Sequence, residues 1–367
     1  MFIQFTTNKV TSTQYEIVDD WGRAFALWCQ NQQPNWDHIV VVTDENVWSL
    51  YGDSVRACLS PQWSLVTLTI APNESSKDFE MLVPLVSNLI QHRIHRRDLI
   101  MCIGGGVVCD LGGLLASLYM RGLNYVNVPT TMMAQIDAAI GGKVGANFGL
   151  RKNVVGGFHH PLLVLIDPTF LDSLPEDHFR TALAEAVKLA IASDEKCLMN
   201  VLENRGEALL SRDPLTVRQL IELCVRGKLQ LLADDPYEND LNRVLNLGHG
   251  MAHALERIPI MPGERLPLHG EAVALGLAAT IRYARRHNLC SSDRADRLLS
   301  MLASLHLPLS PSSIDRELVK EQLGRISEHR GGVFRLVVPV DQGVRILPHA
   351  DLDSLLDCLY PLEGSLL

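Results

Sequence analysis

The 367-residue sequence lacks the features that would direct a chain into a membrane or a secretory pathway. No apolar run reaches the length of a membrane span, and the first ten residues, MFIQFTTNKV, contain no hydrophobic signal-peptide region. The eight cysteines are scattered without a CxxC pair, which argues against a zinc ribbon or a disulfide framework. We therefore expect a soluble, cytoplasmic protein.

The sequence also lacks an excess of positive charge. Its 42 acidic residues outnumber 33 lysines and arginines, which gives a net charge of −9 and argues against a nucleic-acid partner. A local basic pocket could still bind an anionic small molecule. The hydrophobic content of 47% is typical of globular proteins, and the length predicts two domains.

Short β-rich runs alternate with helical patterns in the first half, which predicts βαβ units and a mostly parallel, Rossmann-like sheet. We expect strands at 38–43, 64–70, 98–103, 125–128 and 162–166, a helix that begins after Asp44, and another that ends near His92. From about Pro175 the pattern is helical, with helices expected at 176–203, 214–232, 244–257, 270–287 and 291–305, and strand only at 332–347. We place the boundary at Leu174–Pro175, between an α/β domain (1–174) and a mainly helical domain (175–367).

Three histidines between residues 245 and 271 predict a metal site in the helical half. His249 and His253 are four residues apart, so on a helix their imidazoles share one face, roughly 6 Å apart along the axis. His269 opens the next apolar-periodic run. Neutral imidazoles at this spacing suit zinc or iron. Gly250 stands where the general-base glutamate of an HExxH metallopeptidase would be, which argues against that class.

Such a site needs another ligand, and Glu185 is the candidate. Glu185 and Lys188 are three residues apart on an otherwise apolar helix. They could form a surface ion pair, but on a buried face each would need a strong partner. Glu185 would then complete a His/His/Glu zinc site, and Lys188 would contact the substrate.

Glycine-rich segments in the first half predict an anion-binding region. Gly104–Gly106 follow a predicted strand and open a helix, where backbone can approach a phosphate closely, although a tight packing turn is the alternative. Thr130 and Thr131 follow the next strand with hydroxyls that could reach a ribose or a phosphate. The Gly-rich span that comes next carries cations and amides, which favours a ligand cradle over an exposed loop: Gln135, Lys143, Asn147, Arg151, Lys152 and Asn153.

Taken together, these segments resemble the 3-dehydroquinate synthase family and, more broadly, the sugar-phosphate cyclases. The resemblance spans roughly residues 70 to 280. It is carried by IGGGVVCDLGG (103–113), YMRG (119–122), VPTT (128–131), QIDAAIGGKVGAN (135–147), RKN (151–153), LAEAVK (183–188), LNLGHGMAH (245–253) and LHGEAVALG (268–276). It implies an NAD-binding α/β domain, a helical metal-binding domain, an active site in the cleft between them, and a homodimer.

The resemblance also implies roles for individual residues. Zinc, with cobalt as an alternative, would be bound by Glu185, His249 and His269. The nucleotide contacts would be Asp44, Asn46, Glu74, Lys77, Gly105, Gly106, Val107, Asp110, Thr130, Thr131, Asp137, Lys143 and Lys152, and Asp137 would also be catalytic. The substrate and its phosphate would meet Lys143, Asn153, Lys188, Lys228, Asn246 and His253, with Arg121 reaching across from a second subunit.

The reaction implied is elimination of phosphate through transient oxidation by NAD, β-elimination, re-reduction and an internal aldol closure. The main expectation is synthesis of 3-dehydroquinate from 3-deoxy-arabino-heptulosonate 7-phosphate, because Asn246, His253 and Gly142-Lys143 match that type. The alternative is a relative of the epi-valiolone or deoxy-inosose synthase type, which acts on sedoheptulose 7-phosphate or another carboxylate-free sugar phosphate. The segments GLLASLY (113–119) and Asn147-Phe148 resemble those relatives.

Three departures from the dehydroquinate pattern bear on the substrate. Asn242 stands where the family has a carboxylate-reading arginine, and Arg243 comes one residue later. The late DKK motif is Glu328-His329-Arg330 here, and the loop 258–267 is longer.

Two other classes rank lower. A metal-dependent polyol dehydrogenase would have no need for a phosphate pocket at Lys143, Lys152 and Asn153. A ligand-sensing homologue without catalysis would be expected to lose its zinc ligands, and all three are present.

Overall fold

The computed structural model describes residues 11–59, 61–149, 151–240, 243–258, 266–311, 314–329 and 332–361. The chain divides into two compact units. Unit 1 comprises Met1–Thr130 and Ala138–Thr169, and unit 2 comprises Thr131–Asp137 and Phe170–Leu367. The boundary predicted at Leu174–Pro175 lies just after η5 (Pro168–Ser173), within unit 2. Within the described ranges, no helix combines the length and the apolar character that crossing a membrane requires.

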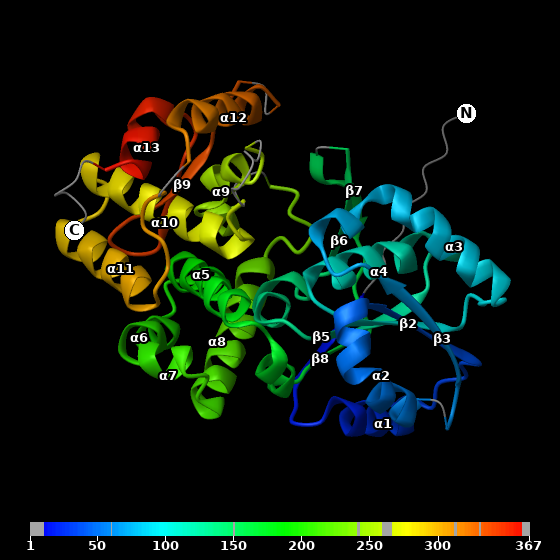
Figure 1. The fold of residues 1–367 in the computed structure, drawn as a ribbon. Coiled ribbons are helices and arrows are strands. Elements are labelled where there is room, and N and C mark those ends of the chain that lie inside the picture. The colour runs from blue at the N-terminus through cyan, green and yellow to red at the C-terminus, as the bar shows by residue number, and fades with distance from the viewer. Residues whose placement is uncertain are drawn as a thin grey trace, which may run out of the picture. The chain divides into compact units, whose positions relative to one another are not determined.

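Unit 1 contains a six-stranded parallel sheet in the order β1-β8-β5-β4-β2-β3, which confirms the predicted α/β class (Figure 1). Its strands are β1 (Gln14–Ile17), β2 (His38–Asp44), β3 (Ser64–Ile70), β4 (Leu99–Gly104), β5 (Asn124–Pro129) and β8 (Leu163–Ile166). Its helices are α1 (Trp21–Gln32), α2 (Glu45–Leu59), α3 (Leu82–Gln91) and α4 (Gly106–Leu118), with 3-10 turns at η1 (Glu74–Lys77), η2 (Phe79–Met81) and η3 (Tyr119–Arg121).

The buried strands are apolar on both faces of the sheet, because successive apolar side chains point to opposite sides. Val40 and Val42 of β2 and Ile100 of β4 belong to one buried cluster with residues of α3 and α4. Because successive side chains of a strand point to opposite faces, Ile39 and Val41 face the other way. Figure 1 shows α1 and α2 on that side. A sheet covered on both faces reads as continuous apolar runs, as β2 does.

The register brings the carboxyl ends of three strands to one edge. Thr43 of β2 pairs with Ile103 of β4, and Ile103 pairs with Val128 of β5. Asp44 and Gly104 therefore lie at the same edge of the sheet, where parallel sheets bind their ligands.

The glycine-rich segment predicted to be a ligand cradle forms an antiparallel hairpin, β6 (Lys143–Phe148) with β7 (Arg151–Phe158). Gly156 faces β6 so closely that an added Cβ would lie 2.3 Å from the carbonyl oxygen of Val144. The glycines permit β6 and β7 to pack closely. The cationic residues of the segment therefore lie on a hairpin.

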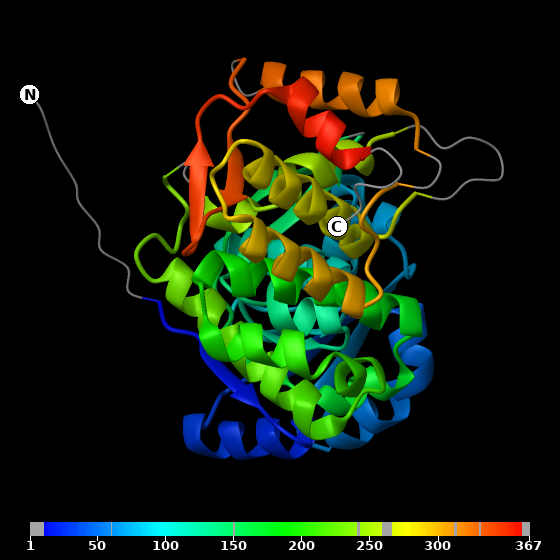
Figure 2. The ribbon, with the colours of Figure 1, turned by 90° about the vertical axis from the view of Figure 1, so that its left-hand side faces the viewer.

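Unit 2 is mainly helical, with a two-stranded antiparallel sheet of β9 (Leu336–Pro339) and β10 (Val344–Leu347). Its helices are α5 (Glu176–Ser193), α6 (Lys196–Asn204), α7 (Gly206–Leu210), α8 (Pro214–Leu232), α9 (His249–Leu255), α10 (His269–Arg286), α11 (Ser292–Ser304), α12 (Arg316–His329) and α13 (Leu352–Leu359). A short π-helix, η4 (Ala134–Ala138), and a 3-10 helix, η6 (Val244–Asn246), are also present. Figure 2 shows α10 in contact with α11 and α13, and α10 also packs against α5 and α9.

Two predicted helices have different limits in the structure. The helix expected at 176–203 is interrupted at Asp194, whose φ of +51° ends α5 in a left-handed conformation. The helix expected at 244–257 begins only at His249, because Gly248 has a φ of +76° that an L side chain rarely adopts.

Backbone-to-backbone packing fixes the first turns of α9 and α10. A Cβ on Gly276 of α10 would lie 2.1 Å from the carbonyl oxygen of Gly248, directly before α9. A Cβ on Gly270 would lie 1.9 Å from the carbonyl oxygen of Thr181 on α5. Glycine at these positions lets α5, α9 and α10 approach one another closely where α9 and α10 begin, at His249 and His269.

We expect Gly276→Ala to lower the free energy of unfolding by about 1–3 kcal/mol, because the added methyl group overlaps backbone that cannot move aside alone. Gly324→Ala is the matched control. Gly324 is also helical, on α12, and an added Cβ there meets nothing within 4 Å. The control should be neutral or stabilising by about 0.5–1 kcal/mol. Denaturant unfolding of both variants tests this, and equal effects would refute the close packing of α9 and α10.

Candidate functional site

The three residues predicted to bind metal lie together in unit 2. Glu185 is on α5, and His249 and His269 are the first residues of α9 and α10. Glu185 Oε1 lies 3.1 Å from His269 Nε2 and 3.4 Å from His249 Nε2, and one ligand atom from each residue lies within 4.8 Å of the others. Ligand atoms about 2 Å from a tetrahedral zinc ion lie roughly 3.3 Å apart, so this spacing fits such an ion.

The second nitrogen of each imidazole faces a protein acceptor. His269 Nδ1 lies 3.0 Å from Glu256 Oε1, and His249 Nδ1 lies 3.2 Å from the carbonyl oxygen of Leu247. Acceptors at Nδ1 hold each ring in place and would favour the tautomer whose Nε2 lone pair can bind a metal ion. Two imidazole nitrogens and one carboxylate oxygen form a donor set that suits Zn²⁺ or Co²⁺.

The electrostatics of the triad favour a bound cation. Burial raises the pKa of Glu185, but the charge of Lys188 and the contact with His249 outweigh it and hold that pKa well below its usual range. Burial lowers the pKa of His269, yet hydrogen bonds with Glu185 and Glu256 outweigh it and raise the pKa to about 10. The carboxylates that stabilise a proton on His269 would equally stabilise a divalent cation.

A buried ion cluster adjoins the triad through Glu185. Lys188 contacts Glu185 Oε2 and donates to Asp137 Oδ2 at 2.9 Å. Lys228 on α8 contacts Asp137 Oδ1 and donates to the Asp137 carbonyl oxygen at 2.7 Å. The two lysines are only 2% and 4% exposed. Asp137 lies in the short π-helix η4, and π-helical turns often occur at functional sites.

The ionisation of this cluster follows from its mutual contacts. Burial raises the pKa of Asp137, but the charges of Lys188 and Lys228 outweigh burial and lower it. Burial lowers the pKa of Lys188, but Asp137 and Glu185 outweigh it and raise it above its ordinary value. Asp137 and Lys188 are therefore both charged at neutral pH, and the ammonium group can donate to an oxygen that gains negative charge.

His253 lies one helical turn after His249 on α9, as predicted, and their ring centroids are 5.6 Å apart. Burial, and then the neighbouring His249, lower the pKa of His253 to about 3. Its imidazole is neutral at neutral pH. Asn246, the other predicted phosphate contact in this unit, lies in η6, three residues before α9.

The carboxyl edge of the sheet in unit 1 holds predicted cofactor residues. Gly104–Gly106 join β4 directly to α4, and no described side chain caps that helix at Gly105. The amide of Thr130 donates to the carbonyl oxygen of Gly104 at 3.0 Å. The buried hydroxyl of Thr130 has no hydrogen-bond partner among the described residues. An uncapped helix N-terminus beside an unpaired hydroxyl fits the phosphate and ribose of a nucleotide.

A chain of polar contacts links five further predicted site residues to this edge. Lys77 Nζ contacts both Asp110 Oδ2 on α4 and Asn153 Oδ1 on β7. The amide of Asn153 donates to Asn147 Oδ1 at 2.9 Å, and Asn147 Nδ2 donates to Glu74 Oε1 at 3.0 Å. The hairpin is thus connected to η1 and to the first half of α4.

The remaining predicted nucleotide contacts lie at or after the ends of these strands. Asp44 Oδ1 accepts from the amide of Val47 at 2.9 Å, which confirms Asp44 as the cap of α2, and burial raises its pKa. The others lie on the segments that follow β2, β4 and β5 along the chain: Asn46, Val107, Thr131, Lys143 and Lys152.

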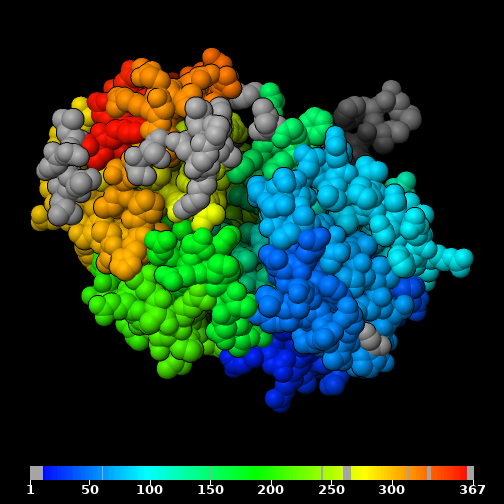
Figure 3. Space-filling model, in the orientation of Figure 1, coloured from blue at the N-terminus to red at the C-terminus, as the bar shows by residue number. Residues whose placement is uncertain are grey.

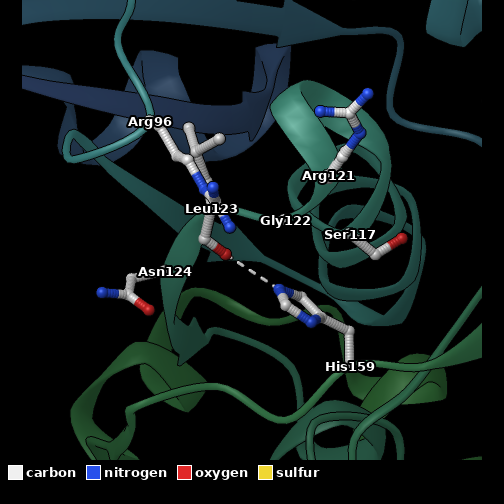
Figure 4. A pocket seen from close by; sticks show the side chains of 7 residues that line it. All are labelled: Arg96, Ser117, Arg121, Gly122, Leu123, Asn124 and His159. Carbon is white, nitrogen blue, oxygen red and sulfur yellow. Dashed lines mark hydrogen bonds between the residues drawn. The ribbon is translucent and has the colours of Figure 1, made fainter. Parts of the chain in front are cut away.

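Arg121 lies apart from these groups. It ends η3 with a φ of +67° and lines a polar pocket of about 340 Å³ beside the amino end of β5 (Figure 4). Arg96 and Asn124 line the same pocket, and His159 Nε2 lies 2.8 Å from the carbonyl oxygen of Leu123. Within one chain, Arg121 therefore lies near the amino ends of the parallel strands, whereas Gly104 lies at their carboxyl ends.

Arg243 is already engaged by a buried carboxylate. Its Nε lies 3.2 Å from Glu238 Oε2, and its Nη2 donates to the Glu238 carbonyl oxygen at 3.0 Å. Arg243 has extended backbone and directly precedes η6, so it does not lie on a helix. Asn242, Arg330 and residues 259–265 of the long loop lie outside the described residues, while Glu328 is exposed on α12.

Two carboxylates with roles here were not predicted. Glu256 orients His269, and its position seven residues after His249, two helical turns on, is a signal that the sequence contained. Glu238 binds Arg243 from a nearby turn, and no spacing rule would have indicated it.

Comparison with known proteins supports the fold and identifies the family. Residues 67–181 match a family model described as "3-dehydroquinate synthase N-terminal", and residues 182–326 match "3-dehydroquinate synthase C-terminal". A 2-epi-valiolone synthase of Stigmatella aurantiaca is 38% identical over 84% of this chain and 78% of its own length. A 3-dehydroquinate synthase of Symbiobacterium thermophilum is 36% identical over 88% of this chain and 90% of its own.

One solved structure is similar over almost the whole chain. It is the 2-epi-5-epi-valiolone synthase ValA of Streptomyces hygroscopicus subsp. jinggangensis, described with NAD⁺ and Zn²⁺ bound. The two are 29% identical with a TM-score of 0.87, and the match covers 97% of this chain and 98% of ValA.

We expect Glu256→Gln to weaken Zn²⁺ binding about 10- to 100-fold, because an amide is a poorer acceptor for the Nδ1 proton of His269. Competition with a chromophoric chelator measures this on the metal-free protein. Glu328→Gln, an exposed carboxylate on α12, is the control and should bind as the wild type does. Unchanged affinity in Glu256→Gln would show that Glu256 does not orient a metal ligand.

Proposed function

The chain belongs to the 3-dehydroquinate synthase family, and we propose that it is a sugar-phosphate cyclase that eliminates phosphate with NAD and a divalent metal ion. The observation that supports this most directly is the junction at Glu185. One buried carboxylate belongs both to a metal-type triad with His249 and His269 and to the ion cluster of Lys188 and Asp137. A substrate oxygen held by that metal would also be able to accept a hydrogen bond from Lys188.

The residues divide the work as follows. When bound, NAD would accept and return one hydride, and the metal would favour the alkoxide form of the hydroxyl that it holds. Glu185, His249 and His269 would hold the metal, and Lys188 and Lys228 would donate hydrogen bonds to substrate oxygens as these gain negative charge.

Four residues are proposed to recognise the phosphate, as the family resemblance implies. We assign its contacts to Lys143, Asn153, Asn246 and His253. The neutral imidazole of His253 can donate one N–H hydrogen bond to a substrate oxygen. Arg121 would act on the phosphate of a second subunit, which requires a homodimer.

The contact between Arg243 and Glu238 bears on which sugar phosphate is bound. To read a substrate carboxylate, Arg243 would have to give up its contact with Glu238. Asn242 is uncharged and cannot replace it. These two residues favour a substrate without a carboxylate, such as sedoheptulose 7-phosphate, and we place that substrate first.

Synthesis of 3-dehydroquinate is the second candidate, supported by Asn246, His253 and Lys143, which match that type. It requires another cation to bind the carboxylate of 3-deoxy-arabino-heptulosonate 7-phosphate.

Phosphate release by the purified protein with NAD⁺ and Zn²⁺ tests both candidates side by side. We expect release from sedoheptulose 7-phosphate, with turnover on 3-deoxy-arabino-heptulosonate 7-phosphate at least tenfold lower and no net NADH. The reverse preference would make the protein a dehydroquinate synthase. Net NADH without phosphate release would contradict the cyclase proposal and identify a polyol dehydrogenase.

A further inference from the structure

A second cluster of metal-type side chains lies in unit 1, at the opposite edge of the sheet from Gly104. His38 is the first residue of β2, and His95 and Asp98 lie in the turn between α3 and β4. The Nδ1 atoms of His38 and His95 lie 3.3 Å and 3.7 Å from the same oxygen, Asp98 Oδ2. One ligand atom from each of the three lies within 4.8 Å of the others, as at Glu185.

The carboxylate of Asp98 is held rigidly by the backbone around it. It is 1% exposed, and its Oδ1 accepts from the amides of Asp37 at 3.2 Å and His38 at 3.0 Å. Its Oδ2 accepts one further amide, that of His95, at 2.7 Å. A carboxylate oxygen has two lone pairs, so Oδ2 can still bind a cation.

The imidazole of His38 is placed as a ligand would be. Its Nδ1 is buried and makes no hydrogen bond among the described residues, although Asp98 Oδ2 is only 3.3 Å away. The nitrogen is therefore not aligned on the carboxylate, and ligands that converge on a shared ion show this arrangement. The separation of 3.3 Å is also roughly the edge of a tetrahedral zinc site.

The other imidazole leaves the cluster open to solvent. His95 is 65% exposed, on the turn that projects in cyan at the right of Figure 3. Water could complete the coordination from that side. Arg96 and Arg97 follow it and are also exposed, so solvent and salt screen their charges. Anchoring the turn accounts for Asp98 alone and leaves two imidazole nitrogens on one oxygen unexplained.

We propose that His38, His95 and Asp98 form a second divalent-metal site, separate from Glu185, His249 and His269. Two imidazoles and one carboxylate suit Zn²⁺ or a similar borderline ion, with water in the remaining positions. A metal there would join the start of β2 to the turn before β4. Its role would be structural, because the carboxyl edge with Gly104 lies at the other end of the same strands.

Titration of the metal-free, full-length protein with Zn²⁺ against a chromophoric chelator tests the site. Four proteins are compared: wild type, His95→Ala, His92→Ala and His269→Ala. His95 is exposed, so its loss should not affect folding. His92 is the matched control, because it is exposed on the same turn at the end of α3 and belongs to neither cluster. Turnover is measured in parallel for the His95 and His92 variants.

The wild type should bind two equivalents of Zn²⁺. His95→Ala should lose one of them, with at least a tenfold fall in affinity at that site, and should keep its turnover within twofold. His92→Ala should bind two equivalents, and His269→Ala should lose the other one. A single equivalent in the wild type, an unchanged titration in His95→Ala, or an equal loss in His92→Ala would overturn the proposal. Since binding is counted directly, the result does not depend on the proposed reaction.

Discussion

A single buried carboxylate, that of Glu185, connects the parts of unit 2 that carry chemistry. It faces two imidazole nitrogens on one side and Lys188 on the other. Burying such a charge is costly unless several partners compensate it. The helices that supply those partners therefore have to meet closely, and glycines at 248, 270 and 276 allow their backbones to do so. The close packing of these helices therefore also fixes the positions of the side chains around Glu185.

The two units supply different physical resources. At the carboxyl ends of its parallel strands, unit 1 offers backbone groups, an uncapped helix N-terminus and the buried hydroxyl of Thr130. Unit 2 offers fixed charges at low exposure, where electrostatic interactions are strong. The first set of groups suits a nucleotide and the second suits developing oxyanions, as the proposed redox-assisted elimination would require.

Local patterns predicted the elements that depend on local sequence. The strand at 64–70 and the helix at 214–232 have the predicted limits, because each is bounded by turn or capping residues. The helical spacing of His249 and His253 indicated a metal site, and the family resemblance named Glu185, His249 and His269 as its ligands. The hairpin of β6 and β7, the break at Asp194, and the partners Glu256 and Glu238 were missed. The helical spacing of Glu256 from His249 was a signal that went unused, whereas the others depend on a contact or a positive φ that no period in the sequence encodes.

In the proposed reaction the cofactor is used and restored within one turnover, and the fate of an isotopic label tests this. A heptulose 7-phosphate that carries deuterium at the carbon to be oxidised would be converted with NAD⁺ and Zn²⁺, and the carbocyclic product analysed by mass spectrometry. We expect the product to retain the deuterium and no labelled NADH to accumulate, because the hydride returns to the carbon that it left. Deuterium recovered in free NADH would show that the hydride is not returned and would refute the proposed reaction.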